Sequence, residues 1–177
     1  MSAPGVAETL LLAIVERGPA LTVQQRQGAV CLWCPTVLRP GDGVDIRGGR
    51  TADRDWWPHA CKPCYANNLR SVATYADWND HLLACAACCQ HAPCSTVSTL
   101  RAAHIQARCR IGRPAVWCME CLSIMRPDEL WQPHLWQSRR GAEPSYRHTG
   151  TCPQWAGDES VDSGHDSGPA DDLPQGR

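Results

Sequence analysis

The chain has 177 residues, of which 12 are cysteine and none is phenylalanine, and its formal net charge is -1. Its large aliphatic residues are too few to build the apolar core of an ordinary globular protein of this length, and its near-neutral charge argues against a wholly disordered chain. The composition therefore predicts a small fold that is held together by its cysteines.

The cysteines favour metal ligation over disulfide formation. The N-terminal sequence, MSAPGVAETLLLAIVERG, lacks the basic start and the long apolar run of a secretory signal peptide. We therefore expect a cytoplasmic protein, in which thiols stay reduced and CxxC pairs serve as metal ligands. No stretch approaches the roughly 20 apolar residues of a membrane span, so we expect no membrane contact.

Residues 1–20 are predicted to form an N-terminal amphipathic helix, and the first metal-binding motif follows it. Residues 31–40 read CLWCPTVLRP. A CxxC turn points two thiolates at one cation, and the later sequence Cys61-Lys-Pro-Cys64 supplies a second pair. The sequence therefore predicts a first metal site made of four cysteines: Cys31, Cys34, Cys61 and Cys64.

The segments around these ligands predict a hairpin followed by a helix. Gly48 and Gly49 lie between two short runs that can form strands, as a hairpin turn requires. After Cys64 the apolar residues of YANNLRSVATYADWNDHLLA recur near helical spacing. A CxxC knuckle, a hairpin and a helix that starts at the second ligand pair resemble a treble-clef zinc finger. This resemblance implies a treble-clef-like module over residues 21–80.

Residues 81–112 are predicted to form a helical module with a second metal site. Within the sequence HLLACAACCQHAPC, one histidine and two cysteines lie at positions i, i+4 and i+7. A continuous helix would place these three side chains on one face, and a further cysteine follows after a short loop. The expected ligands are His81, Cys85, Cys88 and Cys94.

Three other residues compete with Cys94 for the fourth position in this site. Cys89 and His91 lie close to the set in sequence, whereas His104 lies ten helical residues, or about 15 Å, beyond Cys94. With Cys94 as the ligand, Cys89 and Cys109 have no metal to bind. We expect both of these thiols to be buried and inert.

Residues 113–152 repeat the first motif. Residues 118–127 read CMECLSIMRP, which matches CLWCPTVLRP in both cysteines, a Ser or Thr, two apolar residues and Arg-Pro. In the first site, 26 residues separate Cys34 from Cys61. The same gap counted from Cys121 leads to His148, and Cys152 follows closely. No helix is expected after this set, because proline and the tail follow, so the sequence predicts a zinc-ribbon-like module. The expected ligands are Cys118, Cys121, His148 and Cys152.

Residues 153–177 combine aspartates with serine, glycine and proline, a composition that predicts a disordered acidic tail. The rest of the chain has more basic than acidic residues, but the negative charge of thiolates bound to zinc would offset this excess. Affinity for nucleic acid must then come from a local patch. Two adjacent arginines in the glycine-containing loop SRRGAEPSY are the strongest candidates for phosphate contacts. The whole expected patch is Arg113, Arg126, Arg139 and Arg140.

The eight tryptophans allow two interpretations. Their rings could stack on the bases of a nucleic acid, or they could fill the core in place of the missing phenylalanines. We expect most of them to be core residues, among them Trp56, Trp57, Trp78, Trp117, Trp131 and Trp136.

Two short resemblances point to regulators of transcription. HLLACAAC resembles the HxxxCxxC signature of zinc-containing anti-sigma factors, small regulators common in actinobacteria, and implies a protein partner from the transcription machinery. The spacing of Cys85, Cys88 and Cys94 resembles part of the iron–sulfur motif of WhiB-like regulators, which implies Cys61 or Cys64 as the fourth ligand. The strong excess of arginine over lysine is also typical of GC-rich genomes, such as those of actinobacteria and their phages.

An enzymatic function is not expected. Treble-clef folds include nucleases of the His-Me finger class, which need a histidine base on the hairpin between the ligand pairs. The corresponding interval here contains only His59, two residues before a ligand and without an Asp-His neighbour. A zinc ion with four protein ligands also has no open position for an activated water.

Together, these features predict a small α+β protein of three tandem zinc-stabilised modules that binds about three Zn²⁺ ions. We expect a non-catalytic regulator that contacts nucleic acid through its C-terminal ribbon. The alternatives are a regulator that binds a protein of the transcription machinery, an iron–sulfur regulator and a degenerate nuclease. No small-molecule substrate is expected.

Overall fold

The computed structural model describes residues 4–16, 21–46, 56–90, 92, 94–126, 128–138 and 141–152. Over these residues the chain forms five helices and three antiparallel sheets of two strands each, which confirms a small fold of mixed helices and short sheets. The helices are α1 (Pro4–Glu16), α2 (Val23–Arg26), α3 (Lys62–Ala84), α4 (Ala86–Cys89) and α5 (Ser95–Arg110). The strands are β1 (Val44–Asp45), β2 (His59–Ala60), β3 (Val116–Trp117), β4 (Ile124–Met125), β5 (Trp131–Ser138) and β6 (Gly141–His148).

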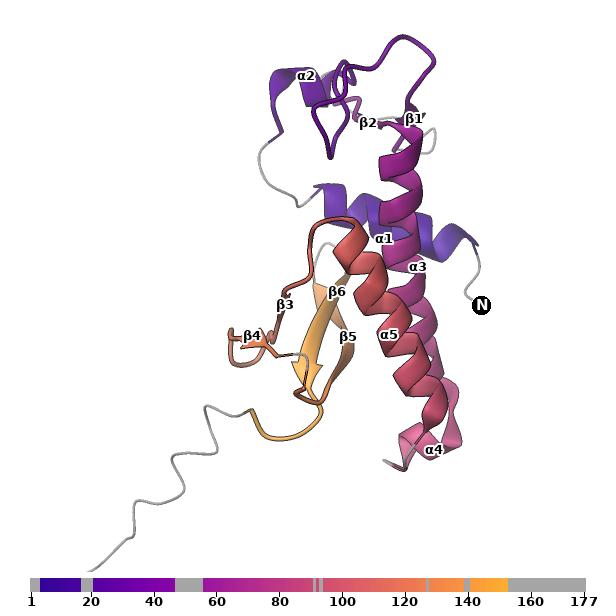
Figure 1. Cartoon of the computed structure of the whole chain (residues 1–177), viewed down its shortest axis with the longest axis vertical. Helices are drawn as coiled ribbons and strands as arrows, with labels where there is room; N and C mark the ends of the chain where they lie inside the picture. Colours follow the sequence, from indigo (N-terminus) through magenta and orange to yellow (C-terminus); the bar gives the residue numbers. More distant parts are fainter. Residues whose placement is uncertain are drawn as a thin grey trace, which may run out of the picture.

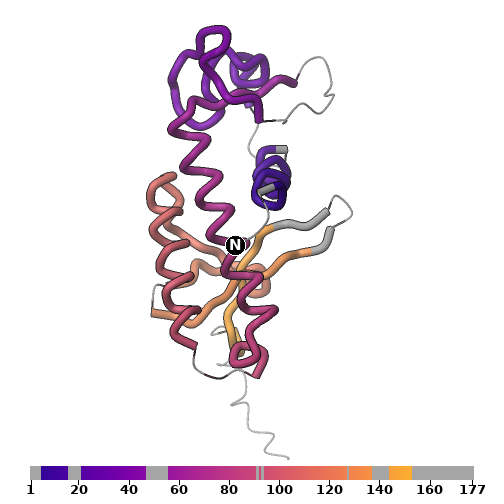
Figure 2. The backbone as a smooth tube through the Cα atoms, turned by 90° about the vertical axis from the view of Figure 1, so that its right-hand side faces the viewer, coloured from indigo at the N-terminus to yellow at the C-terminus, as the bar shows by residue number. Residues whose placement is uncertain are grey.

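Helix α3 is the axis of the molecule (Figure 1). Its 23 residues span roughly 35 Å, from the β1–β2 pair at one end to α4 at the other. Helix α5 runs back beside α3, and α1 crosses α3 near its middle (Figures 1 and 2). The predicted boundary between residues 80 and 81 falls inside α3, so the first and second predicted modules share this helix. Within the described part of the chain, no helix is both long and apolar enough to cross a membrane.

Three clusters of buried apolar side chains lie along α3. At its N-terminal end, α1 packs against the first CxxC knuckle and the β1–β2 pair through Leu12, Val15, Leu32, Ile46 and Ala60. Near the middle, α1 packs directly on α3 through Ala7, Leu10, Leu11, Val72 and Ala76. Toward the C-terminal end, α3 packs against the β3–β6 region through Tyr75, Trp78, Val116, Met125, Trp131 and Tyr146.

Strands β5 and β6 form the longest hairpin, with Trp131 opposite His148 at one end and Ser138 opposite Gly141 at the other. The short β3–β4 pair adjoins it, because Cys118 forms a parallel bridge with Tyr146. This pairing brings the second CxxC knuckle next to the end of β6. The predicted turn at residues 48 and 49 and the predicted acidic tail, residues 153–177, lie outside the described residues.

A buried polar network joins α3, α5 and β6. The Nε2 atom of His104 lies 2.6 Å from the hydroxyl of Tyr146, and its Nδ1 atom lies 3.1 Å from the hydroxyl of Thr74. The guanidinium of Arg108 donates to the same Tyr146 hydroxyl at 3.1 Å. Burial, together with the charge of Arg108, lowers the pKa of His104 to about 4. His104 is therefore a neutral, hydrogen-bonded core residue.

The tryptophans divide between the core and the surface. Trp78 and Trp131 are buried, as expected, whereas Trp57, Trp117 and Trp136 are about half exposed, so the prediction is wrong for these three. Alternation along the strands explains two of them. Trp117 lies between two buried residues, Val116 on β3 and Cys118 directly after it. Trp136 is an odd number of residues away from Trp131 on β5, so both tryptophans face away from the core.

Candidate metal centres

Three clusters of histidine and cysteine side chains are compatible with metal binding, and each brings together one predicted ligand set. In every cluster the candidate ligand atoms lie within 4.8 Å of one another. All cysteines of the chain are free thiols. We name the clusters in chain order. The first centre is Cys31, Cys34, Cys61 and Cys64; the second is His81, Cys85, Cys88 and Cys94; the third is Cys118, Cys121, His148 and Cys152.

The distances within the clusters suit a tetrahedral metal ion. The sulfur of Cys61 lies 3.7 Å from that of Cys31 and 3.8 Å from that of Cys34. In the third centre the sulfurs of Cys118 and Cys152 are 3.7 Å apart. Tetrahedral ligands with a Zn–S distance of about 2.3 Å have their sulfurs about 3.8 Å apart. The donor set of each cluster therefore fits zinc.

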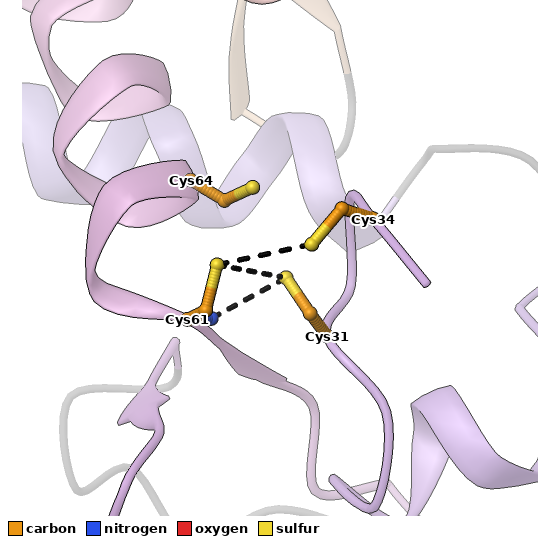
Figure 3. Close-up of side chains that lie close together, drawn as sticks. All are labelled: Cys31, Cys34, Cys61 and Cys64. Atoms are coloured by element: carbon orange, nitrogen blue, oxygen red, sulfur yellow. Dashed lines mark hydrogen bonds between the residues drawn. The ribbon is translucent and has the colours of Figure 1, made fainter. Parts of the chain in front are cut away.

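The first centre joins the knuckle to the start of α3. Cys61 is the N-cap residue of α3 and Cys64 lies in its first turn, where a proline also favours helix initiation. Figure 3 shows these side chains pointing toward those of Cys31 and Cys34. The sulfur of Cys31 accepts a hydrogen bond from the backbone N–H of Cys61 at 3.3 Å. Such bonds stabilise a thiolate and so favour metal binding.

The third centre repeats the knuckle geometry of the first. In both knuckles the first cysteine donates its backbone N–H to the carbonyl five residues later, at 2.8 Å for Cys31 and 2.9 Å for Cys118. The hydroxyls of Thr36 and Ser123 lie 3.2 and 3.0 Å from the sulfur of the second cysteine. The Thr36 hydroxyl lowers the pKa of Cys34 to about 6. The Thr/Ser position of the repeat thus has a physical role, which the sequence comparison alone did not assign.

His148 is held in place by an acidic residue that the sequence did not reveal. Its Nδ1 atom faces the sulfur of Cys121 at 3.8 Å, while its Nε2 atom lies 3.3 Å from a carboxylate oxygen of Glu129. The backbone N–H of Arg126 and the adjacent His148 together lower the pKa of Glu129. A carboxylate on the outer nitrogen fixes the tautomer of a metal-binding histidine. Nothing in the sequence distinguishes Glu129 from other acidic turn residues.

Glu129→Gln should weaken zinc binding at the third centre by roughly 10- to 100-fold, as is typical for such supporting carboxylates. Zinc affinity can be measured by chelator competition on the folded protein. Asp128→Asn is the matched control, since Asp128 is exposed and lies next to Glu129. Equal zinc affinity in the two variants would contradict this role of Glu129.

The second centre forms at a break in the helix. The sequence predicted that one continuous helix aligns His81, Cys85 and Cys88, but α3 ends at Ala84 and Cys85 is extended, with φ -82° and ψ 119°. The short helix α4 then turns Cys88 back toward His81, whose Nε2 atom lies 3.3 Å from the sulfur of Cys94. The side chain of His81 lowers the pKa of Cys94 to about 6.

The rival ligands of the second centre lie elsewhere. Cys89 is exposed, and its sulfur donates to backbone carbonyls of α3 at 3.6 and 3.7 Å. His104 belongs to the buried network described above, and His91 lies outside the described residues. Cys109 is also exposed. The expectation that Cys89 and Cys109 are buried is therefore wrong, because both lie on solvent-facing sides of α4 and α5.

The structure does not bring together the ligands of the iron–sulfur alternative. That alternative requires Cys61 or Cys64 to join Cys85, Cys88 and Cys94 in one cluster. The first two lie at the N-terminal end of α3, whereas Cys85 caps its C-terminal end, and a helix of that length separates them by roughly 35 Å. One cluster cannot include ligands from both ends.

The candidate nucleic-acid residues are placed unevenly. Arg113 and Arg126 are exposed, whereas Arg139 and Arg140 lie outside the described residues.

His59, the only histidine in the first hairpin segment, lies on β2 with its Nδ1 atom 2.9 Å from the carbonyl of Trp57.

No family model matches the chain, and neither a curated protein nor a solved structure matches it. The three clusters and the side chains around them are therefore the features that indicate what the protein does.

Proposed function

We propose that the protein is a non-catalytic binding protein in which three structural zinc ions, one per centre, hold tandem modules together. The observation that supports this most strongly is that each cluster supplies four nitrogen or sulfur ligand atoms within 4.8 Å of one another. Four protein ligands close the coordination sphere of zinc and leave no position for a reacting water. The first module has the treble-clef order of knuckle, hairpin and helix, and the third has the knuckle and long hairpin of a zinc ribbon.

Burial of the thiols supports a cation in these centres. Burial raises the pKa of Cys152 to about 12, so this thiol stays protonated where no cation is present. A bound dication stabilises the thiolate form directly. Zinc binding is thus the condition under which Cys152, a buried cysteine of the third centre, becomes a charged ligand.

We expect purified protein to contain three zinc ions per chain and little iron, because four tetrahedral nitrogen and sulfur ligands suit zinc. Native mass spectrometry and elemental analysis measure this directly. Cys109→Ser should keep all three ions, since Cys109 belongs to no centre, whereas Cys118→Ser should lose one. A visible iron–sulfur absorbance band would contradict the assignment.

The working role that we propose is contact with nucleic acid through the C-terminal ribbon. Arg126 is exposed beside the third centre, and Arg139 and Arg140 follow β5 in sequence. Exposed Trp117 and Trp136 add aromatic faces that can stack on bases. A protein partner is the second candidate, because the β3–β4 pair also exposes Leu122 and Ile124 beside Trp117, and such apolar surface is typical of interaction sites.

Fluorescence anisotropy with mixed-sequence DNA tests this role. Combined replacement of Arg126, Arg139 and Arg140 by alanine should weaken binding to every sequence alike and reduce the salt dependence, with all zinc retained. Arg70→Ala, an exposed position on α3, is the control. Binding that survives the triple replacement would contradict the ribbon as the contact surface. Recovery of one stoichiometric protein partner, with no DNA binding, would favour the second candidate.

A further inference from the structure

A hollow of about 290 Å³ lies between the first centre and the end of α5. It adjoins a second hollow of about 170 Å³, with which it shares Asn68, Ile111 and Arg113. Ligand sites of small molecules commonly occupy a few hundred Å³, so the two together are of suitable size. The first hollow, which we call the arginine hollow, is lined by Trp33, Cys64, Asn67, Asn68, Arg110, Ile111, Gly112 and Arg113.

Three separate segments of the chain form the arginine hollow. Helix α5 ends in a turn at Gly112, whose φ of 68° suits glycine. In this turn the backbone N–H of Arg113 donates to the carbonyl of Arg108 at 3.0 Å, so the chain reverses beside α3. The first turns of α3 contribute the amide side chains of Asn67 and Asn68, and the first knuckle contributes Trp33.

The arginines of this hollow differ from those further along α5. Arg101 and Arg108 stack on the rings of Trp131 and Tyr146, at 4.7 and 5.3 Å from the ring centroids, and both donate hydrogen bonds to backbone carbonyls at 2.7 Å. Arg110 and Arg113, by contrast, are exposed, and their guanidinium groups make no hydrogen bond or ion pair with any described residue. They are the unpaired cations at the rim of the hollow.

Trp33 offers a fixed aromatic surface in the same place. It lies between the two cysteines of the first knuckle and packs against two of the three apolar clusters, so its ring is held rigidly while part of it lines the hollow. An aromatic ring, two amide side chains and two free guanidinium groups are the groups that bind an unpaired nucleotide. The base needs stacking and hydrogen bonds, and the phosphate needs cations.

We propose that the arginine hollow binds one unpaired nucleotide of a single-stranded nucleic acid. The base stacks on Trp33 and meets the amide of Asn67, and Arg110 and Arg113 bind the flanking phosphates. The buried amide of Asn68 donates to the carbonyl of Cys64 at 2.9 Å and forms part of the wall beside the base. A concave site of this kind requires a base that is free of its duplex partner. The proposal rests on the proposed nucleic-acid role and adds to the contact at the ribbon a specific contact in the α3–α5 region.

One other role for these arginines needs a direct test. Zinc bound by four thiolates carries net negative charge, and Cys64 of the first centre lines the hollow. Arg110 and Arg113 would then offset the charge of the metal centre and bind no ligand. The two roles differ in one measurable respect, because only charge compensation makes zinc retention depend on the arginines.

The test uses the zinc-loaded full chain and a fluorescein-labelled mixed-sequence 12-nucleotide single strand, with its duplex and free AMP as competitors. The variant combines Arg110→Ala with Arg113→Ala. The control combines Arg39→Ala with Arg70→Ala, which removes the same charge from exposed positions outside the hollow. Loss of two phosphate contacts should lower the salt slope by about 1.4 and weaken binding about 25-fold at 0.1 M salt. The control should bind as the unmodified chain does, and single strands should compete better than duplex.

Each other outcome overturns the proposal in a recognisable way. Equal losses of affinity in the variant and the control indicate that only the net charge of the protein attracts the nucleic acid. Loss of zinc in the variant indicates that the two arginines offset the charge of the metal centre. Competition by AMP without measurable affinity for the oligonucleotide indicates a free-nucleotide site instead. If binding survives the hollow variant but is lost on combined replacement of the ribbon arginines, only this inference fails. If the unmodified chain binds no nucleic acid at all, the proposed nucleic-acid role fails with it.

Discussion

Cys61→Ser is expected to unfold the N-terminal part of the protein. The replacement removes one of four ligands from the first centre, and structural zinc in small fingers is worth roughly 10–16 kcal/mol. The apolar cluster at this end is small, and its fully buried members include Cys31 and Ala60, which lie in the knuckle and beside Cys61. Little apolar packing would therefore remain once the metal is lost. Native mass spectrometry should show two zinc ions, and proteolysis should cut before α3.

The matched control for this prediction is Cys89→Ser. Cys89 is exposed, and among the described residues its thiol donates hydrogen bonds only to backbone carbonyls of α3, so the change should alter stability by no more than about 0.5 kcal/mol. Zinc content should stay at three. Equal zinc loss in the two variants would show that Cys89 is a ligand and that the second centre is assigned incorrectly.

The metal clusters were predictable because their chemistry is local and repetitive. A CxxC pair specifies its own turn, and the repeat beginning at Cys118 predicts a second knuckle with the hydrogen bonds of the first. The spacing from Cys121 to His148 could be read from the first copy, although the ligand type differs. The sequence therefore predicted which residues come together in each cluster, and the structure brings the same sets together.

Features that depend on packing between distant segments were not predictable. The break at Cys85 replaces a continuous helix with two helices, because the second cluster requires Cys88 and Cys94 to approach His81 from different directions. Glu129 supports His148 across 19 residues of sequence, and no local pattern marks such a pair. His104, considered as a ligand from its type alone, is instead neutral and bound to Tyr146. In each case tertiary contacts determined the outcome.

Trp78→Ala should destabilise the protein by about 3–5 kcal/mol, the usual cost of removing a large buried aromatic side chain. Trp78 is fully buried on α3, and its ring lies 5.3 Å from that of Trp131, centroid to centroid. It therefore joins the long helix to the hairpin that contains His148. Urea unfolding of the zinc-loaded protein measures the loss. Zinc content should remain three, because Trp78 contributes no ligand and the third centre is closed by its own residues.

Two further variants separate packing from other causes. Trp78→Phe should cost less than Trp78→Ala, since it keeps an aromatic ring and removes an indole N–H that has no hydrogen-bond partner among the described residues. Trp136→Ala should change stability by no more than about 0.5 kcal/mol, because Trp136 is half exposed. If Trp78→Ala released zinc from the third centre, the hairpin would depend on α3 to assemble its metal site. Retention of all three ions with a lower unfolding free energy would mean that zinc fixes each module and that the aromatic core joins the modules to one another.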